Sequence, residues 1–174
     1  PPKGFTRCQW DQSGLLGEAP LWDRFWDNPA LTAQERALFT QIRQQAQRDL
    51  TRISAKLDFG LIHADLVTGN VMVDGPRMQF IDFDDGGYGF RVFDIATALL
   101  KHIDAPDYPI LQDALISGYR SERPIDLAAL DLFLVLRAAT YVGWNITRMG
   151  EDNDGARNAR FIKTAKRLAL AYLA

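Results

Sequence analysis

Apolar residues recur at helical spacing over most of the chain. Thr32 with Glu35 three residues later forms a capping-box signature, and one apolar helix face follows it to about Ala55. After Phe93 the pattern is helical to the end, over about 93–103, 108–119, 126–149 and 156–173, with EDNDG before the last segment. The short apolar runs NVMV and MQFIDF flank Asp74-Gly75, which is a strong hairpin signal. These patterns predict an α+β fold that is mostly helical and contains one small β-hairpin.

The remaining segments lack a clear period. Residues 1–31 are rich in Pro, Gly and Trp, and we expect an irregular lead-in with one helical turn whose aromatic side chains pack on the body. Residues 32–174 then form the main lobe. GLIHADL indicates a short apolar run followed by a loop, and GGYGF indicates a glycine-rich loop.

Composition narrows the class of protein. The chain has 174 residues, enough for a domain with a substantial core, and a net charge of −2, which argues against nucleic-acid binding. A single cysteine, Cys8, rules out an internal disulfide and fits a reducing compartment. Because Asp131 and Arg137 interrupt the most apolar stretch, 127–144, it predicts a core helix rather than a membrane span. With no secretory signal visible, we expect a cytoplasmic protein.

Polar residues gather around the predicted hairpin. Asp65 and Asn70 stand in H-x-D-x-x-x-x-N, and Asp82 follows the second strand. Folding the hairpin brings Asn70 alongside Asp82, and a carboxylate beside an amide oxygen suits Mg²⁺. Asp65, on the preceding loop, is then placed to accept a proton from a hydroxyl. This is the arrangement that phosphoryl transfer requires.

Each residue also has a simpler interpretation. Asp65 could cap a loop, and Asp82 could end a strand without binding a ligand. Asp84 and Asp85 fit a turn entry or a solvated pair, and the glycines after them fit tight turns rather than a phosphate cradle. His102 fits a helix C-terminus with no special role.

The segments LIHADLVTGNVMV and FIDFDDGGYGFRVFDIATAL resemble the aminoglycoside phosphotransferase and choline kinase superfamily. Within it, the chain is most similar to homoserine-kinase-type and stress-response-kinase-like members, over roughly residues 20–150, although Ala64 stands where those members usually have Gly. The resemblance implies a protein-kinase-like C-terminal lobe, ATP and Mg²⁺ as cofactors, and a small-molecule hydroxyl as acceptor. The resemblance implies that Asp65 is the catalytic base or the acid that orients the acceptor hydroxyl. It implies that Asn70 and Asp82 bind Mg²⁺, with Asp84 as a weaker candidate ligand, and that His63 and Asp94 support the catalytic loop. Asp94 also fits an N-cap on local grounds.

Two alternatives stay open within this resemblance. One is a Ser/Thr protein kinase of the stress-response type, and the other is a non-catalytic binding module that has kept the fold. The identity of the acceptor is not readable from the sequence.

The resemblance also implies a partner lobe. Related kinases have a β-rich N-terminal lobe whose lysine holds the ATP phosphates, and no strand-borne V-A-I-K-like lysine precedes Asp65. We therefore expect this chain to be the C-terminal lobe alone. Such a lobe is predicted to be inactive by itself, to bind ATP no tighter than about millimolar because several charge-assisted bonds are lost, and to self-associate through its exposed interlobe face.

A last group of residues shares one face of the predicted helix 126–149. This face carries two arginines with aromatic and amide groups: Arg137, Tyr141, Trp144, Asn145 and Arg148. Either the two arginines of this face pair with structural acids, or the whole group forms a substrate-facing wall. The resemblance gives weak support to the wall. As a wall they would favour an acceptor that bears a carboxylate.

Overall fold

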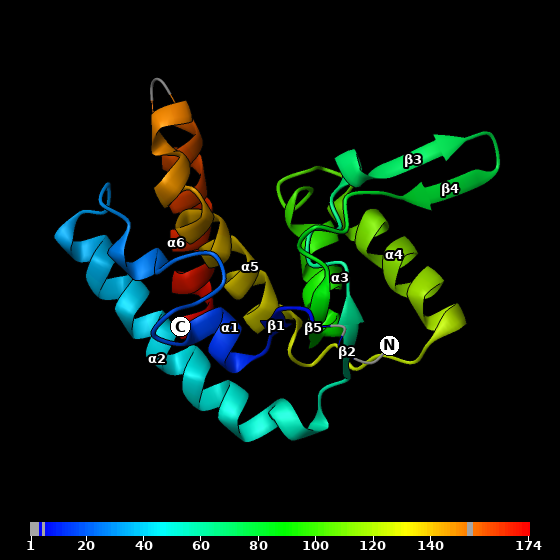
Figure 1. The fold of residues 1–174 in the computed structure, drawn as a ribbon, viewed down its shortest axis with the longest axis horizontal. Coiled ribbons are helices and arrows are strands. Elements are labelled where there is room, and N and C mark those ends of the chain that lie inside the picture. The colour runs from blue at the N-terminus through cyan, green and yellow to red at the C-terminus, as the bar shows by residue number, and fades with distance from the viewer. Residues whose placement is uncertain (1–3, 5, 153–154) are drawn as a thin grey trace. The chain divides into compact units, whose positions relative to one another are not determined.

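The computed structural model describes residues 4, 6–152 and 155–174 (Figure 1), so the EDNDG segment predicted before the last helix is only partly described. The described chain divides into two compact units. Unit 1 combines the residues up to Asp11 with Leu57–Leu130, and unit 2 combines Gln12–Lys56 with Asp131–Ala174. The predicted lead-in thus contributes to both units, through β1, α1 and the 3-10 turn Phe25–Asp27.

Unit 1 contains a three-stranded sheet with the order β1-β5-β2. Its strands are β1 (Gln9–Trp10), β2 (Phe59–Ile62) and β5 (Gly87–Phe90). Strand β5 runs parallel to β1 and antiparallel to β2. The prediction of a loop at GGYGF was wrong, because this segment is the central strand. Its glycines permit close approach: a Cβ on Gly89 would lie 2.7 Å from the Cβ of Trp10.

The predicted hairpin is present in unit 1 as β3 (Val71–Asp74) and β4 (Arg77–Phe80). Val71 pairs with Phe80 at the open end, and Asp74 pairs with Arg77 at the turn. Gly75 takes a positive φ of 55° in that turn, a conformation that glycine adopts at little steric cost. The register therefore places Asn70 and Asp82 just beyond the paired ends of the two strands.

Two helices complete unit 1, α3 (Arg91–Leu100) and α4 (Tyr108–Glu122). Helix α3 buries most of its apolar residues, and Phe93 stacks on Trp10 of β1 with ring centroids 5.4 Å apart. Because α3 follows β5 without an intervening loop, its first turn lies directly after the sheet.

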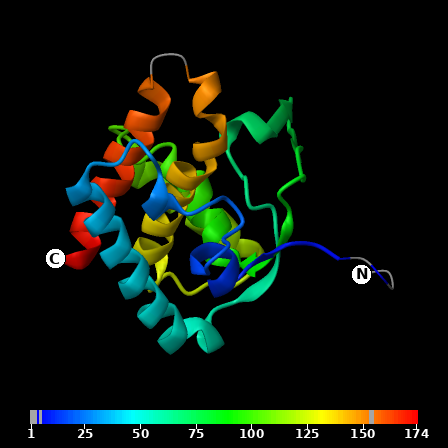
Figure 2. The ribbon, with the colours of Figure 1, turned by 60° about the vertical axis from the view of Figure 1, so that its left-hand side comes forward.

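Unit 2 is helical. Its helices are α1 (Gln12–Leu16), α2 (Ala33–Ile53), α5 (Leu130–Trp144), the 3-10 helix Ile146–Glu151 and α6 (Ala156–Leu173). The predicted capping box is confirmed at the start of α2: Thr32 and Glu35 each accept a hydrogen bond from the other's backbone N–H. Helices α2 and α6 lie side by side (Figure 2), joined by the hydrogen bond that Tyr172 donates to Asp49, at 2.8 Å.

Helix α5 is buried on nearly all sides, which explains why its sequence is apolar with little periodicity. It ends at Trp144, five residues before the predicted end, and a 3-10 helix follows from Ile146. No helix in the described part of the chain is both long and apolar enough to cross a membrane.

Candidate active site

The loop after β2 is held by a single carboxylate of α3. Asp94 accepts hydrogen bonds from the backbone N–H groups of His63 and Ala64, both at 2.8 Å. Ala64 is fully buried and has a φ of +65°, the left-handed region where glycine is favoured and an L-residue is strained. The two bonds to Asp94 therefore stabilise a turn that the backbone alone would disfavour. The local N-cap interpretation of Asp94 was wrong, because the N-cap of α3 is Phe90.

His63 joins this loop to the end of strand β4. Its Nε2 lies 2.9 Å from the carbonyl oxygen of Ile81, and its Nδ1 accepts a weak hydrogen bond, 3.4 Å, from the backbone N–H of Asp65. Because a carbonyl can only accept, the proton belongs on Nε2. The imidazole ring thus connects the residue before Asp82 to Asp65, and it packs on Phe83 with centroids 4.5 Å apart.

Asp65 and Asn70 are in direct contact. The Asn70 side-chain nitrogen donates to the Asp65 carbonyl at 2.9 Å and to the Asp65 carboxylate at 3.2 Å. The turn between them is closed by two backbone bonds, from Val67 to the Asp65 carbonyl and from Asn70 to the Val67 carbonyl. With its nitrogen committed to Asp65, the amide oxygen of Asn70 remains as an acceptor for another group.

Asp82 lies on the neighbouring strand end. The Ile81 N–H donates to the Asn70 carbonyl at 3.0 Å, which extends the β3–β4 pairing by one step. Asp82 follows with a φ of +64° and is exposed, as is Asp84. No cluster of three or more His, Cys, Asp or Glu side chains that could hold a metal occurs among the described residues. One carboxylate and one amide oxygen still fit Mg²⁺, which binds few protein ligands and keeps several waters.

The residues predicted as a substrate wall lie in unit 2, and they do not share a single helix face. Asn145 and Arg148 lie beyond the end of α5 at Trp144. Arg137 is fully buried, with its guanidinium 4.2 Å from the Tyr141 ring centroid, and it donates to the Tyr141 hydroxyl. An arginine in this position cannot form a solvent-facing wall.

The other members of the group are also engaged. The Arg148 guanidinium lies 4.2 Å from the Trp144 ring centroid and donates to the Trp144 carbonyl. Asn145 is buried, and its side-chain oxygen accepts a hydrogen bond from Arg157 at 2.7 Å. The aromatic rings therefore stack with arginines of the same unit.

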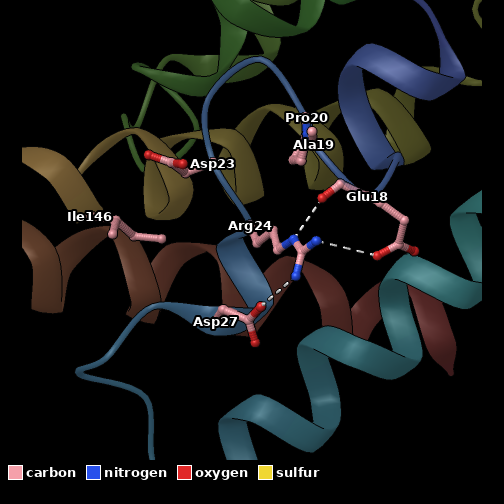
Figure 3. Close-up of a pocket in the computed structure, with 7 residues that line it drawn as sticks. All are labelled: Glu18, Ala19, Pro20, Asp23, Arg24, Asp27 and Ile146. Carbon is pink, nitrogen blue, oxygen red and sulfur yellow. Dashed lines mark hydrogen bonds and ion pairs between the residues drawn. The ribbon is translucent and has the colours of Figure 1, made fainter.

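Unit 2 also contains an open pocket of about 340 Å³ (Figure 3) that none of the predicted site residues lines. Its lining residues are Glu18, Ala19, Pro20, Asp23, Arg24, Asp27 and Ile146. Arg24 points into the acidic group and forms ion pairs with Glu18 at 3.6 Å and with Asp27 at 3.7 Å. A hydrogen bond from Arg43 is the main reason that the pKa of Glu18 lies below its usual value. Arg24 and Arg43 thus already neutralise much of the negative charge of this pocket.

Comparison with known proteins places the chain in a family. Residues 6–133 match the model of the phosphotransferase enzyme family. A homoserine kinase of Brucella abortus is 30% identical over 136 residues, which is 75% of this chain but 42% of that protein. The chain spans less than half the length of this curated relative.

Solved structures agree with the sequence match. A microcompartment-associated aminopropanol kinase superposes with a TM-score of 0.87 at 31% identity, over 99% of this chain and 55% of that one. The amicoumacin kinase hAmiN, solved in complex with AMP-PNP, Ca²⁺ and Ami, superposes with a TM-score of 0.68 at 24% identity, over 94% of this chain and 51% of that one. The fold is thus the α+β, mostly helical fold of kinase-like phosphotransferases, and the chain belongs to the phosphotransferase enzyme family.

Proposed function

We propose that this chain carries the catalytic residues of an ATP- and Mg²⁺-dependent phosphotransferase that acts on a small hydroxyl compound. The contact that carries the proposal is the hydrogen bond from the Asn70 amide to the Asp65 carboxylate, on a strand end paired with the residue before Asp82. It supports a single site in which a proton acceptor lies next to oxygen ligands for a cation.

Asp65 is the proposed general base. The Asn70 amide fixes the carboxylate through one oxygen, and the turn held by Asp94 fixes the backbone on which Asp65 stands. A carboxylate oriented in this way can accept the proton of an acceptor hydroxyl as that oxygen attacks phosphorus.

Asn70 and Asp82 are the proposed Mg²⁺ ligands, with Asp84 as a weaker candidate. When bound, Mg²⁺ would neutralise charge on the phosphate groups. The amide oxygen of Asn70 suits this role because the amide nitrogen is already bonded to Asp65. Asp82 contributes the negative charge.

For the acceptor we propose a small amino alcohol. The support is that the two most informative relatives are named as kinases of homoserine and of aminopropanol, which both carry an amine and a hydroxyl. Arg137 no longer supports a carboxylate requirement, because its guanidinium is buried against Tyr141. The proposed acceptor class therefore rests on the amine and hydroxyl alone.

The experiment has a transfer arm and a metal arm. In the whole protein, ³¹P NMR with Mg-ATP should detect a phosphomonoester with homoserine, 1-amino-2-propanol or choline, and none with matched amines that lack the hydroxyl. Mn²⁺ titration by water-proton relaxation should detect binding that Asp82→Asn weakens and Asp113→Asn, an exposed residue of α4, does not. Mn²⁺ binding that is the same in both variants would remove Asp82 from the site.

A further inference from the structure

The segment that follows Asp82 has little support of its own. Residues 81–86 connect β4 to β5. Within residues 83–86, the backbone hydrogen bond is the one from Gly86 to the Phe83 carbonyl, at 3.0 Å. Asp82 itself has a left-handed backbone, which costs free energy in an L-residue. A metal ligand in such a segment needs external contacts to keep one position.

Arg7 supplies the first of these contacts. Its guanidinium donates through Nη2 to the Phe83 carbonyl at 3.0 Å and through Nη1 to the Asp84 carbonyl at 3.3 Å. The two nitrogens of the planar fork thus span two consecutive peptide groups. A pair of bonds with this geometry restrains the rotation of the peptide between Phe83 and Asp84.

Trp10 supplies the next contact. Its indole Nε1 donates to the Asp85 carbonyl at 2.9 Å, and the Cys8 thiol lies 3.6 Å from the same oxygen. The indole cannot move easily, because Trp10 is buried and stacked on Phe93. The carbonyls of three successive residues, 83–85, are therefore all held by side chains from residues 7–10.

Strand β1 is brought to this loop by the sheet. Its backbone pairs with β5, and the Cys8 carbonyl accepts from the Tyr88 N–H at 3.0 Å. A side chain at Gly87 would collide with the Cys8 carbonyl, so this approach depends on glycine. The backbone pairing of β1 with β5 and the side-chain hydrogen bonds to residues 83–85 therefore restrain the same short loop.

We propose that Arg7 and Trp10 are positioning residues for the metal-binding loop, and that strand β1 holds Asp82 and Asp84 in the geometry that binds the cation. The inference rests on the proposed function, because it requires a metal at Asn70 and Asp82. It adds to that function two residues, Arg7 and Trp10, that lie more than 70 positions before the loop in the sequence and contact its carbonyl groups.

The sign of the metal effect distinguishes positioning from simple electrostatics. Arg7 is a cation close to a cation site, so removing its charge should strengthen Mn²⁺ binding if charge alone mattered. If Arg7 positions the loop, Arg7→Gln should instead weaken Mn²⁺ binding, by about tenfold, equivalent to about 1.4 kcal/mol. Arg7→Lys keeps the charge but cannot span both carbonyls, so it should restore binding only in part.

Trp10→Phe tests the second contact without changing charge. The ring can still stack on Phe93, but the donor to the Asp85 carbonyl is lost. We expect weaker Mn²⁺ binding and faster hydrogen exchange at the Gly86 amide, each by roughly three- to tenfold, the range that corresponds to the loss of about one hydrogen bond.

Two control variants match these changes. Arg77→Gln removes an exposed arginine from β4, and Trp26→Phe removes an indole from unit 2. Both should leave Mn²⁺ affinity and Gly86 exchange at the wild-type value. All variants are compared in the whole protein, with thermal unfolding measured in parallel to verify that each is folded.

The outcomes separate this inference from the function on which it rests. Wild-type protein that does not bind Mn²⁺ would overturn the proposed metal site, and the inference with it. Wild-type binding that Asp82→Asn weakens, combined with equal or tighter binding in Arg7→Gln, would leave the proposed function standing and overturn the positioning role. Weaker binding in both Arg7→Gln and Trp10→Phe, with unchanged controls, is the result we expect.

Discussion

Replacing Asp94 by Asn tests how the proposed base is held in place. Both carboxylate oxygens of Asp94 accept 2.8 Å hydrogen bonds, from the N–H groups of His63 and Ala64. Asparagine has almost the same shape but one acceptor oxygen, so its amide group would face one of these N–H groups. The variant therefore loses one bond and places two donors against each other.

The size of the effect follows from the burial of these donors. His63 and Ala64 are 6% and 0% exposed, so water cannot replace the lost acceptor. A hydrogen bond to a charged group contributes about 1.5–3 kcal/mol. We expect Asp94→Asn to speed hydrogen exchange at the His63 and Ala64 amides by about tenfold to 150-fold, and to lower turnover because Asp65 follows on the same backbone.

The matched control is Asp126→Asn. Asp126 accepts one hydrogen bond, from the Ala128 N–H at 2.9 Å, which asparagine can also accept. The free energy of unfolding of the Asp126→Asn protein should therefore differ from that of the wild type by less than about 0.5 kcal/mol. Exchange at His63 and Ala64 that changes no more in Asp94→Asn than in this control would refute the idea that Asp94 holds the loop.

Two further predictions concern the stability of each unit. In unit 1, a hydrogen bond from Arg123 lowers the pKa of Asp58 in the folded protein despite partial burial. Asp58→Asn should therefore destabilise the protein in urea by an amount that is constant above about pH 5 and shrinks below about pH 4, first because the unfolded chain takes up a proton at this residue and then, at lower pH, because the folded protein does. A difference that grows in acid would contradict this sign. In unit 2, burial and the bond to Asp49 raise the pKa of Tyr172, so the phenol stays a donor, and Tyr172→Phe should cost about 1–2 kcal/mol in urea unfolding; no loss would mean that the bond adds nothing to the α2–α6 contact.

The helices could be predicted from the sequence because their signals are local. Thr32 and Glu35 mark the start of α2, and the last helix begins at Ala156 and ends at Leu173 as its period indicates. The three-stranded sheet could not be predicted, because β1 has two residues and β5 alternates glycine with aromatics. Its pairing joins Trp10 to Gly89, and nothing in either segment alone identifies the other.

The candidate active site shows the same difference between local signals, which the sequence reveals, and long-range contacts, which it does not. The spacing of Asp65 and Asn70 was enough to place the two residues near each other, since one short turn connects them. For Arg137 the sequence left open a structural ion pair or a substrate-facing wall, because periodicity does not reveal that Trp22 and Tyr141 cover its guanidinium. Arg7 was missed because its role depends on the strand pairing that the sequence concealed.

The turnover of Asp65→Asn in the whole protein, with Mg-ATP and the preferred amino alcohol, tests whether Asp65 is the general base. We expect a fall in kcat of about 10²-fold or more, the range for a general base, with the KM for ATP nearly unchanged. Asp113→Asn, on the exposed surface of α4, should keep wild-type turnover. Near-normal kcat in Asp65→Asn would mean that this carboxylate is structural and that Asp65 is not the general base.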